Sequence, residues 1–199
     1  MKETLQQLVE RVKKCTLCKD KLPYPPKPIF RVSSTAVLLI VGQAPGIRVH
    51  NTGIPWNDPS GDKLREWLLL DREQFYNVSK IAIIPSGLCY PGKGERGDLP
   101  PVPECAPQWH PEFRKHLKRL KLTLLVGSHA QNYYLKGKQK PTMAETVRCF
   151  KEYLPDYFPL PHPSPRNIMW FKRNKWFEKY VLPELRKIVS AILTNYFVR

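Results

Sequence analysis

The sequence AVLLIVGQAPG, residues 36–46, decides the fold. Its first part, residues 36–41, is an unbroken apolar run rich in β-branched side chains, which is typical of a strand buried in a parallel sheet. In the turn that follows, Gly42 and Gly46 let backbone N–H groups approach a ligand that a Cβ would block. Because open α/β sheets bind ligands at the carboxyl ends of their strands, we expect this loop to form the floor of an active site. An ordinary strand-to-helix connection is the alternative.

Three further short apolar runs alternate with segments of helical periodicity. The runs cover residues 81–84, 122–126 and 157–160, and the expected helices cover 2–14, 62–70, 71–76, 108–120, 143–153 and 174–192, with one more beginning at 127–129. Strands that alternate with helices imply a parallel sheet with helices on both faces. We therefore predict an α/β protein, a three-layer α/β/α sandwich with a central four-stranded parallel sheet, as a single domain over residues 1–199. The loops after the first, second and fourth strands then meet at one edge of the sheet.

The charge of the chain indicates its partner. The sequence has 33 Lys and Arg against 17 Asp and Glu, a formal net charge of +16. Such an excess suits a polyanion, most simply nucleic acid, with an anionic membrane surface as the alternative. No stretch approaches the ~18 consecutive apolar residues of a membrane span, and the first residues lack the apolar segment of a signal peptide. We expect a monomeric, cytoplasmic protein.

Four of the five cysteines form a candidate metal site. Cys15 and Cys18 make a CxxC pair, and Cys89 and Cys105 bracket a loop rich in Gly and Pro. Four thiolates suit either tetrahedral zinc or an iron–sulfur cluster, and a metal centre would explain how so long a loop stays ordered. An odd count without an export signal argues against a disulfide framework. The alternative is that these are buried apolar side chains, which is how we interpret Cys149 within its helix.

Polar side chains and one tryptophan stand in the loops at the expected sheet edge. The first loop offers Gln43, Asn51, Asn57 and Asp58, and the last offers His162, Ser164, Arg166 and Asn167. Trp56 follows a Gly-x-Pro turn that would hold its ring rigidly. The plainer interpretations are a turn or helix cap for Asp58 and a core side chain for Trp56. His162, between two prolines, would be an unusual core histidine.

At these residues the chain resembles the uracil-DNA glycosylase superfamily. GQAPG (42–46) looks like the first motif of that superfamily, HPSPRN (162–167) like the second, and TGIPW (52–56) like a base-stacking segment. HPSPRN with the following NKWFE is especially close to the single-strand-selective monofunctional uracil glycosylases. The four cysteines are similar in order and spacing to those of thermophilic iron–sulfur uracil-DNA glycosylases. The resemblance covers roughly residues 9–185.

The resemblance implies hydrolysis of the N-glycosidic bond of uracil, or another deaminated base, flipped out of DNA in base-excision repair. Trp56 would stack on the base, and His162 would hydrogen-bond it as it departs with negative charge. The remaining residues that it implies are Gln43, Ala44 and Ser86 at the base, Ser164, Pro165, Arg166 and Asn167 in the DNA, and Cys15, Cys18, Cys89 and Cys105 around a 4Fe–4S cluster, with zinc as the alternative.

Two positions depart from the superfamily pattern. Ala44 stands where several branches have an Asp or Asn that handles the water. Asp58 matches an Asp that one iron–sulfur branch uses instead, so we expect Asp58 to activate the water; His50 is a weaker candidate. The Asn that selects uracil in many members is not evident, since Pro85 and Ser86 occupy that region, and deaminated purines become possible substrates.

Two other functions stay open on the sequence. One is a non-catalytic protein that binds damaged DNA on the same fold, which Ala44 and the missing Asn suggest. The other is a nucleotide or nucleoside hydrolase, which rests on the glycine loop and fold analogy alone. Three other histidines, His110, His116 and His129, are interpreted as structural or surface residues.

Overall fold

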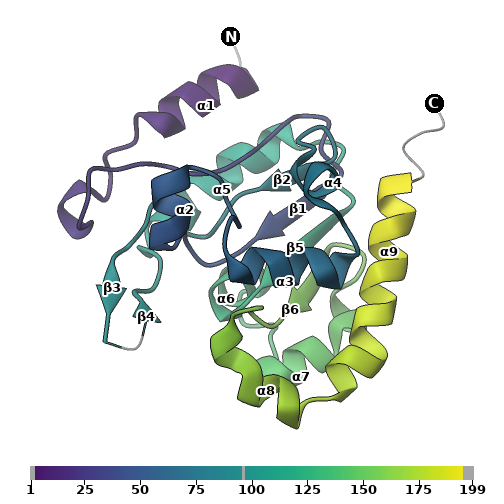
Figure 1. Cartoon of the computed structure of the whole chain (residues 1–199). Coiled ribbons are helices and arrows are strands. Elements are labelled where there is room, and N and C mark those ends of the chain that lie inside the picture. Colours follow the sequence, from purple (N-terminus) through teal and green to yellow (C-terminus); the bar gives the residue numbers. More distant parts are fainter. Residues whose placement is uncertain (1–2, 96, 195–199) are drawn as a thin grey trace.

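The computed structural model describes residues 3–95 and 97–194, and its centre is a four-stranded parallel sheet (Figure 1). The strands, in the spatial order β2-β1-β5-β6, are β2 (Ile81–Ile83), β1 (Leu38–Val41), β5 (Leu122–Val126) and β6 (Tyr157–Leu160). In the register of the sheet, Ile40 of β1 lies between Ile83 of β2 and Leu124 of β5. The predicted four-stranded parallel sheet is confirmed.

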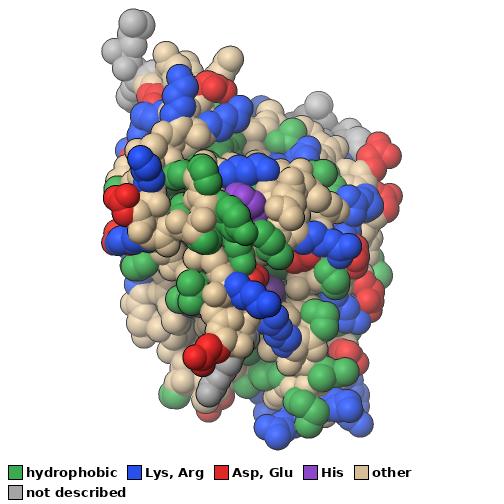
Figure 2. Space-filling model, turned by 60° about the vertical axis from the view of Figure 1, so that its left-hand side comes forward, with side chains coloured by type: hydrophobic (Ala, Val, Ile, Leu, Met, Phe, Trp, Pro, Cys, Tyr) green, Lys and Arg blue, Asp and Glu red, His purple; other side chains and the backbone are tan. Residues whose placement is uncertain are grey.

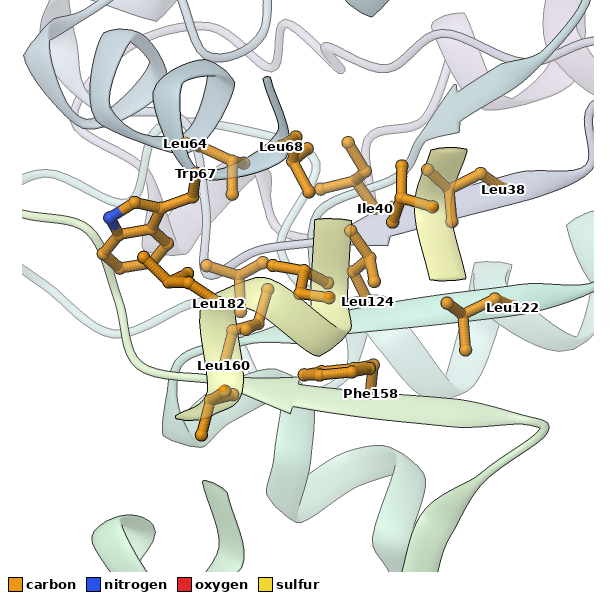
Figure 3. Close-up of a cluster of buried hydrophobic side chains, with 14 of the residues drawn as sticks. Leu38, Ile40, Leu64, Trp67, Leu68, Leu122, Leu124, Phe158, Leu160 and Leu182 are labelled. Atoms are coloured by element: carbon orange, nitrogen blue, oxygen red, sulfur yellow. The ribbon is translucent and has the colours of Figure 1, made fainter. Parts of the chain in front are cut away.

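Side chains of each strand alternate between two cores, and this alternation produces three layers. Ile40 and Leu124 point into one core, whereas Leu39 and Leu125 point into the other. The first core, drawn in Figure 3, is covered by α3 (Pro59–Leu68), α4 (Arg72–Tyr76), α7 (Met143–Arg148), the π-helical turn η4 (Phe177–Val181) and α9 (Leu182–Thr194). The second is covered by α1 (Leu5–Lys13), α5 (Cys105–His116) and α6 (Ser128–Leu135). The three-layer α/β/α prediction is therefore confirmed as well.

Capping side chains set several helix boundaries. Thr4 and Gln7 form a capping box at the start of α1, with the Thr4 N–H donating to Gln7 Oε1 at 2.8 Å. Helix α3 begins at Pro59, before the predicted start, because Asp58 caps it and proline is favoured in a first helical turn. Helix α5 likewise begins earlier than predicted, at Cys105, and ends at His116.

Several elements in segments rich in turn residues were not predicted. They are α2 (Ile47–Thr52), the hairpin of β3 (Lys93–Gly94) and β4 (Gly97–Asp98), α8 (Ile168–Arg173), and the single 3₁₀ turns η1 (Lys19–Lys21) and η3 (Pro165–Asn167). The predicted helix 143–153 is instead α7 followed by the 3₁₀ turn η2 (Phe150–Tyr153). Cys149 is half-buried at that junction, so its placement in a helix core was wrong. No helix in the described part of the chain is both long and apolar enough to span a bilayer.

Candidate active site

The carboxyl ends of the strands open into a cleft of about 630 Å³. Its walls come from the loops after all four strands and from the segment that leads into α3: residues 42–46, Pro85, 127–129, His162, 164–167, 55–56 and 58–60. The two sequence motifs GQAPG and HPSPRN therefore contribute to the same cleft, as the strand order predicts. Small-molecule pockets commonly have volumes of about 300–1,000 Å³, so a nucleobase with its sugar fits this cleft.

Trp56 and His162 face each other in the cleft. Their ring centroids are 5.6 Å apart, with an angle of 30° between the ring planes. The backbone of Trp56 is left-handed, with φ of 58°, a conformation that a bulky residue adopts only under the constraint of its surroundings. That constraint is visible: Arg65 Nη1 donates to the Trp56 carbonyl at 3.2 Å, and the Tyr76 hydroxyl donates to the Pro55 carbonyl at 2.8 Å.

Two glycines make room for Trp56. A Cβ on Gly42 would lie 2.6 Å from Cζ2 of the indole, and a Cβ on Gly61 would collide with the Trp56 carbonyl. The glycine of the first motif is thus needed for the tryptophan as well as for the turn. The indole is held in a fixed position at the cleft wall, which is what a stacking surface requires.

Asp58 has two roles in the structure. Its Oδ1 accepts a hydrogen bond from the Gly61 N–H at 2.8 Å, which caps α3, and its side chain also lines the cleft. The helix-cap interpretation of the sequence is therefore correct without excluding the catalytic one. Burial raises the pKa of Asp58 above its ordinary value of 3.8, against the opposing effect of the Gly61 hydrogen bond. A carboxylate with a raised pKa is a stronger base.

His162 is held as a neutral imidazole. Burial, and to a lesser degree the nearby His129, lowers the pKa of His162 to about 4. The loop that carries it is fixed by Asn167, whose Nδ2 donates to the His162 carbonyl at 2.8 Å. Gly127, with φ of 87°, has the left-handed backbone that favours glycine, and it lies beside this loop: a Cβ there would be in ordinary contact with the His162 Cβ, at 3.4 Å.

Most of the other predicted residues also line the cleft. Ala44 does, and so does Gln43, whose Nε2 donates to the Leu99 carbonyl at 3.4 Å. The four predicted DNA-contacting residues form one rim: Ser164, Pro165, Arg166 and Asn167. Ser86 is not among the lining residues; it is buried, and its hydroxyl donates to the Gly42 carbonyl at 2.9 Å, which supports the first loop from behind. His50 also lies outside the lining.

Sequence reasoning missed several residues of the cleft. Asp98, Ser128, His129 and Met143 line it. Ser128 and His129 follow β5 at the same sheet edge, so the predicted topology was sufficient to find them. Asp98 lies on the hairpin that was not predicted, and nothing in the sequence pattern pointed to it.

The four predicted metal-binding cysteines line a second cavity, separate from the cleft. Cys15, Cys18, Cys89 and Cys105 come together there with apolar neighbours such as Leu22 and Trp109. All are free thiols, and burial raises the pKa of Cys89 to about 11 and that of Cys105 to about 12.

The same four thiols of this cysteine cavity are the candidate ligands of the predicted metal site. Within residues 3–95 and 97–194, no three His, Cys, Asp or Glu side chains are arranged so as to hold a metal ion. Four thiolates suit either a tetrahedral zinc or an iron–sulfur cluster, and the choice between the two stays a prediction. The Leu88 N–H donates to Cys105 Sγ at 3.3 Å.

The cleft and the cysteine cavity share one wall. The Ser86 N–H donates to the Gly42 carbonyl and the Gly87 N–H to the Gln43 carbonyl, both at 2.9 Å. Gln43 faces the cleft, while Gly87 and the following Leu88 line the cysteine cavity. The loops after β1 and β2 are therefore joined along their backbones, with the two cavities on opposite sides.

Comparison with known protein families agrees with this geometry. The chain matches the family described as the Uracil DNA glycosylase superfamily over residues 30–186. The matched span contains the whole sheet and every loop that lines the cleft, together with Cys89 and Cys105. It begins after Cys15 and Cys18.

Proposed function

Since the chain belongs to the uracil-DNA glycosylase superfamily, we propose that it hydrolyses the N-glycosidic bond of a deaminated base extruded from DNA. One observation carries the proposal. Trp56, Asp58 and His162, which are far apart in the sequence, wall a single cleft of about 630 Å³. They supply an aromatic surface, a carboxylate and a neutral imidazole, which are the three groups that this hydrolysis needs.

Base recognition is the first step. The scissile bond is out of reach while the base is stacked, so the nucleotide must rotate into the cleft. There the base stacks on Trp56, whose ring is fixed by Gly42 and Gly61. The amide of Gln43 lies where it can read the polar edge of the base. Uracil is the substrate that we propose first, with hypoxanthine and xanthine as the alternatives.

Departure of the base is the step assigned to His162. Cleavage of the bond leaves negative charge on the base and positive charge on the sugar. A neutral imidazole donates a hydrogen bond to the developing anion, and a donor already in place is often the largest single contribution to catalysis. The low pKa of His162, about 4, keeps the ring in this neutral form at neutral pH.

Water activation is assigned to Asp58. Its carboxylate accepts a proton from the water that attacks the sugar carbon, and it also offsets the positive charge on the sugar. The Gly61 hydrogen bond to Oδ1 fixes the orientation of the carboxylate. Since Ala44 has no group for this task, the chemistry falls to Asp58.

DNA binding is assigned to the rim of the cleft and the helix that follows it. The turn at Pro165–Asn167 leads directly into α8, where Ile168 and Met169 are exposed apolar side chains and Lys172 and Arg173 are exposed cations. Apolar side chains that enter a base step hold the gap left by an extruded nucleotide. The cations neutralise phosphates.

We also propose that Cys15, Cys18, Cys89 and Cys105 hold a 4Fe–4S cluster. Their convergence on one cavity supports this proposal. When bound, the cluster serves as a cross-link between the N-terminal segment and the loop after β2. That loop in turn supports the cleft, because the N–H groups of Ser86 and Gly87 donate hydrogen bonds to the loop after β1.

A panel of oligonucleotides tests the proposed activity. Single strands and duplexes carry one uracil, hypoxanthine or xanthine, are incubated with the purified protein and are then heated in alkali, which cuts at abasic sites. We expect cleavage at one or more of the lesions and none on undamaged controls. Salt-dependent binding of the same strands without any cleavage would instead favour a non-catalytic damage-binding protein.

A further inference from the structure

Three aromatic rings, those of Tyr24, His50 and Tyr90, pack against one another in a cluster outside the cleft, here called the stack. The Tyr24 ring lies 5.1 Å from that of His50 and 6.1 Å from that of Tyr90, with interplanar angles of 29° and 28°. Tyr90 is buried, whereas Tyr24 is 48% exposed. Tyr24 is therefore the member of this group that solvent reaches most. Figure 2 shows Lys and Arg side chains spread over one face of the molecule, among hydrophobic and acidic side chains.

His50 is in this stack for its ring rather than for hydrogen bonds. Its Nδ1 is buried and has no hydrogen-bond partner in the described part of the chain. Buried polar atoms are nearly always paired, so such an exception calls for an explanation. Its backbone is fixed instead, since Lys27 Nζ donates to the His50 carbonyl at 2.5 Å. The ring serves as a rigid support beneath Tyr24.

The stack adjoins the cleft. The Leu99 carbonyl accepts from Gln43 in the cleft wall, and the Leu99 side chain lies against Gly92 beside Pro23, the residue before Tyr24. From the other side, the cleft-lining Asp98 lies against Gly46, the N-cap of the helix α2 that carries His50.

An exposed cation lies on the helix that carries His50. Arg48 is exposed on α2, two residues before His50. It is also close enough to Asp58 to lower the pKa of that carboxyl, although burial has the larger effect and the opposite sign. Arg48 therefore lies near the carboxylate of the cleft and on the same helix as His50.

We propose that Tyr24, supported by His50 and Tyr90, is a stacking platform for an unpaired base next to the extruded nucleotide, with Arg48 at the phosphate between them. The inference rests on the proposed function, because it assumes that the cleft holds a nucleotide of DNA. Aromatic rings bind single-stranded nucleic acid in this manner, since every base has a face that can stack. In a duplex the neighbouring base is paired and stacked already, so the platform favours single-stranded substrates.

Variants of Tyr24 test the platform. We expect Tyr24→Ala to raise KM about tenfold on a single-stranded uracil oligonucleotide, within the range that loss of one base–aromatic stack gives. Its kcat and its KM on the matched duplex stay at the wild-type values. Tyr24→Phe keeps the ring and restores KM. The control is Tyr180→Ala, which removes another exposed tyrosine that does not line the cleft. Thermal melting confirms that each variant is folded.

A binding measurement separates this inference from the proposed activity. The fluorescent base 2-aminopurine, placed on either side of the lesion, is quenched when it stacks, and we expect quenching by the wild type and by Tyr24→Phe but not by Tyr24→Ala. Base release that is independent of Tyr24, with unchanged quenching in Tyr24→Ala, overturns the platform and leaves the glycosylase intact. Quenching that depends on Tyr24, without release of any base, supports the platform and removes the glycosylase.

Discussion

The cleft and the cysteine cavity meet at the paired loops after β1 and β2, yet their chemistry differs. The cleft is open, lined by polar groups, and holds a tryptophan in a left-handed backbone conformation. The cysteine cavity is lined by thiols and apolar side chains, and burial raises the pKa of Cys89 and Cys105. We therefore assign the reaction to the cleft side of the paired loops. For the thiol side we propose a cross-link between the N-terminal segment and the loop after β2.

Loss of His162 is expected to give the largest difference between the effect on the cleft and the effect on the cysteine cavity. His162→Ala removes the hydrogen-bond donor to the departing base, and loss of such a donor costs about 10²–10³-fold in kcat. The absorbance of any bound cluster stays as in the wild type, because His162 lies in the cleft alone. Single-turnover base release measures the effect, with His116→Ala, at the end of α5, as the control. Full activity of His162→Ala would refute the assigned mechanism.

Asp58→Asn tests the carboxylate without removing the helix cap. Asn caps helices about as well as Asp, so the melting temperature stays close to that of the wild type while kcat falls about 10²-fold with loss of the base. Asp71→Asn, at the cap of α4, is the matched control.

The pH profile tests the same carboxylate. Burial raises the pKa of Asp58, and only the ionised form accepts a proton. The wild-type kcat/KM therefore falls as the pH falls through that raised pKa, and the variant lacks this limb. A variant that keeps both the rate and the limb would transfer the base role to another group, such as Asp98.

Removal of one cysteine tests the proposed role of the cysteine cavity. Cys89→Ser is expected to lose the iron and the brown colour that the proposed 4Fe–4S cluster would give the protein, and to lower the melting temperature. The kcat of the folded fraction falls much less than in His162→Ala, because the thiols lie outside the cleft. Cys149→Ser, a half-buried cysteine outside both cavities, should change neither property. A colourless protein that holds one zinc would show that the four cysteines bind zinc rather than a cluster.

Acid should destabilise the protein through two buried histidines, with a smaller effect than the substitutions above. Burial lowers the pKa of His162 in the cleft to about 4, and it does the same for His110, whose Nε2 lies 3.0 Å from the Pro85 carbonyl. The unfolded chain binds these protons near the ordinary pKa of 6.5, before the folded state does, so stability is lost as the pH falls from 6.5 towards 4. Thermal melts over this interval should show a smaller decrease for His162→Ala than for the wild type. Equal decreases would contradict the low pKa of His162.

Much of the fold and most of the cleft could be predicted from the sequence. The unbroken apolar runs predicted the strands, because a parallel strand that is buried on both faces shows no alternation of apolar and polar residues. Since the strands end at the same edge of the sheet, Gln43 and His162 could then be placed together. Short helices such as α2 escaped prediction because Asn, Gly and Pro nearby give the same signal as a loop. Ser86 was predicted at the base, but its side chain lies behind the first loop, since sequence position alone does not tell which side of a loop a side chain faces.

The central claim is that one cavity, walled by Trp56, Asp58 and His162, receives the extruded base. A crystal structure of Asp58→Asn bound to a single-stranded uracil oligonucleotide tests it most directly. We predict that the uracil ring stacks on the indole of Trp56 with the imidazole of His162 within hydrogen-bond distance of the base. A strand bound elsewhere on the protein, with its uracil outside this cleft, would contradict the account.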